Sequence, residues 1–388
     1  MSGLPASAPL TIAMVAGEAS GDMLGANLIE AIKAQRPDAV FIGIGGPRMQ
    51  SAGLHSLFPQ ETLAVRGYVE VICSLPAILS IRRGLVAALL ARRPDVFIGV
   101  DAPDFNLDVE IRLKKAGIRT IHYVSPSIWV WRAERIHKIK RAVNHVLALF
   151  PLEEPIYQAA GIPVTYVGHP LAEKMPIEPD FAAARAQLRI TPPSAPVFAL
   201  LPGSRRGEVE TMAPLFIEAA RLIVAEVPDA QFLVPLATRP TLDLFERILI
   251  QHHATDLPIR KLFGHASDAM LASNAVLVAS GTATLEVALA KRPMVISYKI
   301  SALTYHLVKH KMRLPYVGLP NILCGEALVP ELLQKEATPE KLAQALLGVW
   351  RDQAYCAQLM TRFTALHREL KQDSAARAAA AVLAVVAA

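Results

Sequence analysis

The sequence has little of what marks secreted or metal-binding proteins. Only three cysteines occur among its 388 residues, and Cys73, Cys324 and Cys356 form no C-x-x-C pair. A disulfide framework or a thiolate zinc site would need closer spacing or an even set of cysteines. We therefore expect buried or unreactive thiols in a reducing cytosol.

The sequence also lacks long apolar runs. Residues 1–10 have neither the basic stretch nor the long apolar core of a secretory signal. The most apolar long stretch, 68–81, is interrupted by Glu70 and Pro76 and is shorter than the roughly 20 residues that span a bilayer. We expect no membrane-spanning segment, whereas contact with a membrane surface stays open.

Charged residues are scarce, at 19%, whereas hydrophobic residues make up 53% of the chain. This composition excludes a disordered chain and supplies enough core for two domains. The formal net charge is +6, and basic residues concentrate in segments 132–141 and 299–313. Such segments suit the phosphates of lipids or nucleotides. Because no aromatic motif of an RNA-binding module accompanies them, we expect no nucleic-acid partner.

Short apolar runs of strand length alternate with helical stretches along the chain. Continuous apolar runs are typical of parallel strands that are buried on both faces. The predicted strands are 11–16, 40–44, 96–100, 120–124, 146–150 and 164–167, then 197–201, 232–236, 275–278 and 295–298. The predicted helices between them include 22–35, 81–91, 209–224 and 283–290.

A proline-rich segment, 170–196, separates two rounds of this alternation and is predicted to be a linker. Two rounds predict an α/β protein with two Rossmann-like, doubly wound domains facing each other. We place an acceptor-binding, membrane-facing domain at 1–170 and a nucleotide-binding domain at 171–350. The last segment, 351–388, is predicted to be helical and could pack back on the first domain.

In the first domain, two loops follow predicted strands, which is where open α/β sheets bind ligands. One loop contains Gly17, Glu18, Ser20 and Asp22, with glycine spacing that fits neither the dinucleotide fingerprint nor the hydrolase elbow. Its residues could border a ligand, or Glu18 and Ser20 could simply form a turn and helix cap.

The other loop, 101–106, places Asp101 at the end of a strand, where a carboxylate is suited to act as a general base. The alternative is helix capping, for which Asp104 is better placed.

Two loops of the second domain resemble phosphate-binding sites. Segment 201–208 combines a strand end, a Gly-Ser turn, Arg205 and Arg206, and a helix start. Backbone N–H groups, the positive helix end and arginine donors favour a phosphate there. Segment 280–286 has small hydroxyl residues and a glycine at a helix start, and Glu286 could accept both ribose hydroxyls. The alternative for Glu286 is a favourable interaction with the positive helix end.

Seven segments resemble, in the same order, those of the lipid-A-disaccharide synthase family: AGEASGD (16–22), GIGGPRM (43–49), GVDAPDFN (99–106), YVSPSIWVW (123–131), LPGSRRGEVE (201–210), SGTATLEVAL (280–289) and LPNIL (319–323). The resemblance implies a GT-B fold, with two Rossmann-like domains, and an inverting glycosyltransferase. Its expected reaction joins UDP-2,3-diacylglucosamine to 2,3-diacylglucosamine 1-phosphate (lipid X). The products would be UDP and the β-1,6-linked disaccharide 1-phosphate for lipid A.

The resemblance also implies residue roles. Asp101 aligns with the family's essential aspartate and is the expected base, Glu18 is the reserve, and Arg205 should stabilise the leaving diphosphate. The expected acceptor-side residues are Gly17, Ser20 and Asp22. The expected UDP-binding residues, among which Arg206 matches the family least well, are Ser204, Arg205, Arg206, Ser280, Gly281, Thr282, Thr284, Glu286 and Asn321. No DXD-type metal motif occurs, so we expect neither a metal nor a cofactor.

Because both substrates carry acyl chains, we expect a cytoplasmic protein that is peripheral on the inner membrane. Val69, Val71 and Leu75 are the predicted membrane contacts, although an apolar stretch of this length could equally belong to a core. The oligomeric state stays open, and a homodimer is the commonest arrangement.

Three alternatives share parts of the pattern. Another GT-B transferase acting on a lipid-linked acceptor, such as a peptidoglycan precursor, would use the same phosphate and ribose residues. Segments 101–106 and 123–131, however, favour the lipid A family. A sugar-nucleotide epimerase would need no lipid contact. A non-catalytic nucleotide-binding, membrane-associated protein would bind UDP without turnover.

Overall fold

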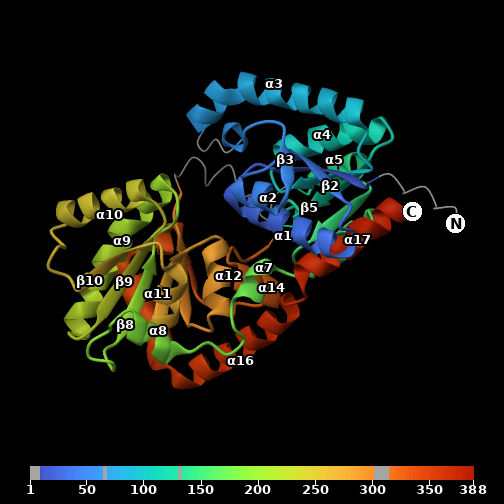
Figure 1. The fold of residues 1–388 in the computed structure, drawn as a ribbon. Helices are drawn as coiled ribbons and strands as arrows, with labels where there is room; N and C mark the ends of the chain where they lie inside the picture. Colours follow the sequence, from blue (N-terminus) through green and yellow to red (C-terminus); the bar gives the residue numbers. More distant parts are fainter. Residues whose placement is uncertain (1–8, 64–67, 130–132, 301–313) are drawn as a thin grey trace. The chain divides into compact units, whose positions relative to one another are not determined.

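A computed structural model of the chain describes residues 9–63, 68–129, 133–300 and 314–388, with the backbone alone for 68–74. The chain divides into two compact units (Figure 1). Unit 1 comprises Met1–Glu173 together with Leu370–Ala388, and unit 2 comprises Lys174–Glu369. The C-terminal segment therefore returns to the unit in which the chain begins.

Unit 1 is built on a seven-stranded sheet in the order β3-β2-β1-β4-β5-β6-β7. All its strand pairs are parallel. Chain order reverses between β1 and β4, which is the point where open α/β sheets bind ligands. The strands are β1 (Thr11–Ala16), β2 (Val40–Ile44), β3 (Leu54–Ser56), β4 (Val96–Val100), β5 (Arg119–Tyr123), β6 (His145–Ala148) and β7 (Val164–Tyr166).

Helices cover both faces of this sheet. On one face, buried side chains of α1 (Ala19–Gln35) and α17 (Ser374–Ala387) share a core with β1 and β4. Helix α17 lies along α1 (Figure 1), and Arg119 Nη1 donates to the carbonyl of Val386 at 2.7 Å. On the other face pack α3 (Tyr68–Arg92) and α4 (Pro103–Lys115). The remaining helices are α2 (Pro47–Ala52), η1 (Gln60–Thr62), α5 (Arg135–Ala142) and α6 (Glu153–Ala159).

Unit 2 has a six-stranded parallel sheet in the order β10-β9-β8-β11-β12-β13, and here chain order reverses between β8 and β11. Its strands are β8 (Val197–Leu201), β9 (Gln231–Leu236), β10 (Ile259–Phe263), β11 (Ala275–Ala279), β12 (Met294–Tyr298) and β13 (Glu331–Leu333).

Two groups of helices pack on opposite faces of the unit 2 sheet. One face carries α9 (Arg206–Glu226), α10 (Arg239–Gln251) and α15 (Pro339–Arg351), and the other carries α8 (Phe181–Gln187) and α11 (Ala266–Ala272). The other helices in the described part of unit 2 are α12 (Thr282–Leu289), α14 (Leu319–Cys324), η2 (Gln334–Glu336) and α16 (Gln353–Leu370), whereas α7 (Pro170–Lys174) lies at the end of the first segment of unit 1.

The predicted α/β class with two parallel sheets is confirmed, and every predicted strand is present with slightly different ends. Segment 170–196, predicted as a linker, instead contains α7 and α8, and Ala184 and Leu188 of this segment are buried in the core of unit 2. Helix α1 begins at Ala19, before the predicted start at Asp22. Among the described residues, no helix is long and apolar enough to cross a bilayer.

Candidate active site

In unit 2, the loops that follow β8 and β11 meet at a cavity of about 330 Å³. The two strands are hydrogen-bonded neighbours, so their carboxyl ends lie side by side at the reversal of chain order. Six residues predicted to bind UDP line this cavity: Ser204, Arg205, Ser280, Gly281, Thr282 and Glu286. Glu208 and Tyr298 line it too, and neither was predicted.

The start of α9 at this cavity is capped by a side chain of its own helix. Glu208 Oε2 accepts the backbone N–H groups of Ser204 and Arg205 at 3.0 and 3.2 Å. Gly203 has a φ of +124°, and a Cβ on it would lie 2.4 Å from the Glu208 Cβ, so glycine is required there. The exposed Arg205 side chain pairs with Glu208 Oε1 at 3.4 Å, and the N–H groups predicted to hold a phosphate already bind the other oxygen of this carboxylate.

The start of α12 forms the other side of the cavity. Gly281 adopts a φ of +149° and lets the chain turn from β11 into the helix. Thr284 is buried, donates to the carbonyl of Gly281 at 2.8 Å and accepts the N–H of Leu319 at 3.3 Å. Thr284 therefore shapes the loop and does not line the cavity. Burial raises the pKa of Glu286, and Lys174 opposes that shift.

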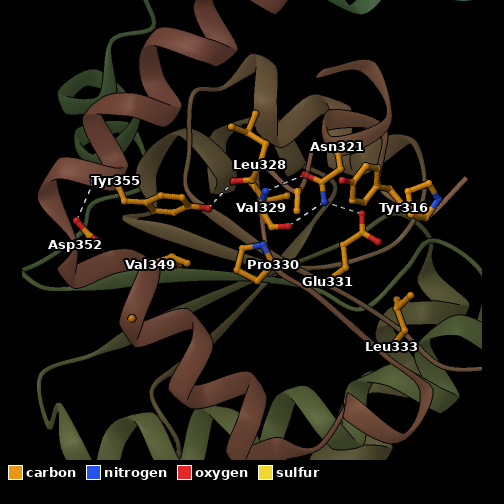
Figure 2. A pocket seen from close by; sticks show the side chains of 13 residues that line it. Tyr316, Asn321, Leu328, Val329, Pro330, Glu331, Leu333, Val349, Asp352 and Tyr355 are labelled. Carbon is orange, nitrogen blue, oxygen red and sulfur yellow. Dashed lines mark hydrogen bonds between the residues drawn. The ribbon is translucent and has the colours of Figure 1, made fainter. Parts of the chain in front are cut away.

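Arg206 and Asn321, also predicted to bind UDP, lie elsewhere in unit 2. Arg206 pairs with Glu210 at 2.8 Å on the exposed side of α9. Asn321 lines a second cavity of about 590 Å³ (Figure 2). Its amide donates to Glu331 at 2.8 Å and to the Val329 carbonyl at 2.9 Å, and its oxygen accepts the Val329 N–H at 2.8 Å. Through these bonds, Asn321 holds the segment 329–331 against α14.

In unit 1, Asp101 lies directly after β4, beside the reversal of chain order. Its N–H donates to the Tyr123 carbonyl at 2.8 Å. Asp101 and Ala102 have φ values of +53° and +44°, a strained conformation that is concentrated at functional sites. Burial raises the pKa of Asp101; His122 opposes this shift, and the Glu18 carboxylate adds to it. Asp101 and Glu18, the two predicted bases, are thus electrostatic neighbours.

The loop after β1 supplies the other residues predicted for unit 1. A Cβ on Gly17 would lie 3.2 Å from that of Ala102, so the loops after β1 and β4 are in contact. Glu18 is the N-cap residue of α1, and both Glu18 and Ser20 are exposed. Asp22 is buried and accepts the N–H groups of Arg48 and Met49, each at 3.0 Å. Asp22 therefore anchors the start of α2.

A buried carboxyl that the sequence did not predict lies beneath the loop after β5. Glu153 accepts Trp129 Nε1 and the N–H groups of Leu149 and Phe150, each at 3.1 Å. Burial outweighs these donors and raises the pKa of Glu153 to about 7. Glu153 thus fixes part of segment 123–129 and is a titratable group inside unit 1.

The predicted membrane contacts fall on α3. Leu75 is 47% exposed, whereas the side chains of Val69 and Val71 lie outside the described residues. In the basic segment 132–141, Arg135 pairs with Asp104 at 2.6 Å and Lys138 pairs with Asp108 at 2.7 Å. The described part of that segment is therefore partly neutralised. Residues 301–313 of the second basic segment lie outside the described residues.

Comparisons with known proteins identify the same family over nearly the whole chain. A family profile described as lipid-A-disaccharide synthetase matches residues 12–383. A lipid-A-disaccharide synthase from Chromobacterium violaceum is 64% identical over 376 residues, which cover 97% of this chain and 97% of that protein. One from Methylobacillus flagellatus is 54% identical over 97% of this chain and 99% of that protein.

A solved structure described as the glycotransferase of kitacinnamycin is similar in fold. It matches 97% of this chain and 99% of its own with a TM-score of 0.63, at 16% sequence identity. At that identity the likeness shows the fold alone. The expected GT-B fold class is confirmed.

Proposed function

Because this chain belongs to the lipid-A-disaccharide synthase family, we propose that it transfers 2,3-diacylglucosamine from its UDP derivative to 2,3-diacylglucosamine 1-phosphate. The chain is a glycosyltransferase, as the sequence predicts. The expected products are UDP and the β-1,6-linked disaccharide 1-phosphate. The observation that carries this proposal is the cluster of Arg205, Glu286 and the 280–282 loop around one cavity in a chain of this family.

The unit 2 cavity is the proposed site for the UDP part of the donor. Its volume of about 330 Å³ falls in the range of small-ligand pockets, about 300–1,000 Å³, so the acyl chains must lie outside it. Glu286 would accept the ribose hydroxyls, and Arg205 would balance the diphosphate charge. Thr282 offers a hydroxyl donor at the start of α12, whereas the Ser280 hydroxyl donates to the Val317 carbonyl at 3.3 Å.

Asp101 is the proposed general base. It takes the proton of the acceptor 6-hydroxyl as that oxygen forms its bond to the anomeric carbon of the donor. The bond from this carbon to the diphosphate oxygen breaks, and UDP leaves with the electron pair. This single displacement inverts the anomeric centre. Base catalysis of this kind contributes about 10²–10⁴-fold to the rate. Glu18, which raises the pKa of Asp101, is the alternative base.

Product analysis tests this proposal. Purified protein in mild detergent receives UDP-2,3-diacylglucosamine and 2,3-diacylglucosamine 1-phosphate, and the product is identified by mass spectrometry and by the proton coupling at its new anomeric centre. We expect a disaccharide 1-phosphate with a β linkage. An α linkage would contradict single displacement, and free diacylglucosamine as the only product would contradict transfer. Asp101→Asn is the inactive control.

We further propose that α3 contacts the membrane surface through its apolar side chains, because both substrates are acylated. The support is Leu75, a large apolar side chain that is 47% exposed. In sedimentation with vesicles containing anionic lipids, we expect Leu75→Asp to bind several-fold less. Ile250→Asp, which changes a 63% exposed side chain of unit 2, is the matched control. Equal binding of both variants and the parent would remove α3 from this role.

A further inference from the structure

Three polar side chains are completely buried behind the loop that carries Asp101. Asn106 and Glu110 lie on α4, and His122 lies on β5; each has an exposed fraction of 0%. Asn106 and Glu110 are four residues apart, so they project from the same face of α4. That face packs on β4, where apolar residues such as Phe97 make up the core. Three polar groups in such a core require a reason.

This polar cluster fits against β4 because residue 99 is a glycine and has no side chain. The strand register places Gly99 opposite His122. A Cβ on Gly99 would lie 2.3 Å from Glu110 Oε1 and 2.8 Å from the Asn106 Cβ. In the space that glycine leaves, Glu110 Oε1 and His122 Nδ1 lie 2.7 Å apart. The pair is thus built into the packing between β4, β5 and α4.

The cluster is connected to Asp101 through the backbone. Asn106 Nδ2 donates to the carbonyl oxygen of Asp101 at 2.8 Å. The N–H of Asp101 donates to the carbonyl of Tyr123, the residue that follows His122. Asp101 has a φ of +53°, so these two bonds hold a strained conformation in place.

The cluster also holds unused hydrogen-bonding capacity. Among the described residues, four buried side-chain polar atoms have no partner, and three of them are Asn106 Oδ1, Glu110 Oε2 and His122 Nε2. Buried polar groups are usually satisfied because an unsatisfied one costs about 1–3 kcal/mol. If these three residues had only a structural role, apolar side chains at their positions would give a more stable core.

The charges around the cluster act on Asp101. Asp101 is faced by His122 from β5, which lowers its pKa, and by Glu18 from the loop after β1, which raises it. Burial lowers the pKa of His122, but the Glu110 and Asp101 carboxylates raise it, and the net shift is upward. Burial raises the pKa of Glu110, opposed by His122 and by Lys138 from α5. A positively charged His122 would therefore favour an ionised Asp101.

We propose that Glu110 and His122 are a positioning pair: Glu110 keeps His122 as an imidazolium, and this cation keeps the neighbouring Asp101 carboxylate ionised for proton abstraction. The inference deepens the proposed transfer reaction and rests on it for the role of Asp101. Neither residue touches the substrate in this account. Both act through Asp101.

The first experiment reads protonation states directly and needs no turnover. The wild-type protein is labelled with 15N-histidine and 13C-carboxyl aspartate, and the signals are assigned with His122→Gln and Asp101→Asn. At pH 7, we expect imidazolium signals for His122. In Glu110→Gln, we expect neutral imidazole and an Asp101 titration midpoint raised by about one pH unit. Neutral His122 in the wild type would overturn the proposal even if the variants failed to fold.

The second experiment reads the pH profile of transfer. In Glu110→Gln, we expect the acid limb of kcat to move up by about one pH unit, so that kcat at the lower pH falls about tenfold and recovers at higher pH. KM for the UDP donor should stay unchanged. Asp38→Asn is the matched control, because it removes an exposed carboxylate of unit 1 that pairs with Arg36 at 2.9 Å and has no part in the cluster.

The results of these experiments distinguish a failure of the proposal for Glu110 and His122 from a failure of the proposed transfer reaction. A kcat lowered equally at every pH, with an unmoved acid limb, would show a structural role and overturn the proposal. If the wild-type protein failed to transfer the sugar, the proposed function would fall, whereas the NMR titration would still decide whether Glu110 and His122 control Asp101.

Discussion

The carboxylate of Glu208 accepts the backbone N–H of Ser204 at 3.0 Å, so an internal anion lies where the sequence predicts a phosphate. The N–H groups of Ser204 and Arg205 directly precede α9, at the positive end of the helix, where an anion is stabilised. A diphosphate in this cavity would have to share these donors with Glu208 or displace it. The Arg205 side chain is then the main cation for the leaving group.

Neutralising Glu208 tests this competition. Glu208→Gln keeps an oxygen acceptor at the helix start and removes the charge that repels a diphosphate, so we expect UDP to bind several-fold more tightly. Isothermal titration calorimetry measures the change, and the gain should shrink as salt is added. Glu210→Gln, whose side chain pairs with Arg206 outside the cavity, is the control. Weaker binding in Glu208→Gln would show that the carboxylate organises Arg205 instead.

The two adjacent arginines should differ sharply in function. Arg205 lines the cavity, whereas Arg206 pairs with Glu210 on the exposed side of α9. Removing a group that stabilises developing charge costs about 10²–10³-fold in kcat, so we expect a loss of that size in Arg205→Ala. Arg206→Ala should retain most of its activity. Steady-state rates of UDP release compare the two, and equal losses would remove Arg205 from its assigned role.

The pH dependence of kcat tests which carboxylate is the base. Burial raises the pKa of Asp101, so activity should fall as pH decreases, beginning at a higher pH than an ordinary carboxyl would give. Asp101→Asn should lose about 10²–10⁴-fold at every pH. Glu18 raises the pKa of Asp101, so Glu18→Gln should move the acid limb to lower pH and keep most of the maximal rate. A loss in Glu18→Gln as large as that in Asp101→Asn would make Glu18 the base.

Glu153 should make stability depend on pH. Its pKa is raised to about 7 by burial, so between about pH 4.5 and 7 the folded protein holds a proton that the unfolded chain has released. The free energy of unfolding should therefore decrease as pH rises through that window, by about 3 kcal/mol at most, and level off above it.

Urea unfolding of Glu153→Gln and the parent at several pH values measures this contribution. The variant should lose the decrease between about pH 4.5 and 7. Glu154→Gln, which changes the adjacent carboxyl, is the matched control. An identical pH dependence in Glu153→Gln and the parent would mean that Glu153 is ionised throughout the window.

The sequence predicts the central strands well because their burial on both faces leaves continuous apolar runs, as in β1 and β4. It does not predict β10, because this strand at the edge of the sheet carries two adjacent charged residues, Arg260 and Lys261, and Phe263 is 61% exposed. Strands β3 and β13 are three residues long and give too short a signal. Helix α8 was not predicted because prolines flank it in the sequence, although Leu188, just after the helix, is buried in the core of unit 2.

Residues in loops after strands were predictable because chain order reverses at β1/β4 and at β8/β11, which brings those loops together. The partners of these residues were not predictable. Asn321 and Thr284 stay predicted UDP-binding residues, and the hydrogen bonds by which they also hold loops depend on tertiary packing that the sequence does not show. Conversely, Glu110 and His122 resemble an ordinary helix residue and strand residue, because a pairing between α4 and β5 depends on tertiary packing.

The most direct test of the account is release of UDP from UDP-2,3-diacylglucosamine by the purified protein, measured with and without 2,3-diacylglucosamine 1-phosphate. We predict release only when the acceptor is present, in equal amounts with the disaccharide 1-phosphate, and loss of both products in Asp101→Asn. Release of UDP that is independent of the acceptor, or UDP binding without any release by a folded protein, would contradict the proposed transfer.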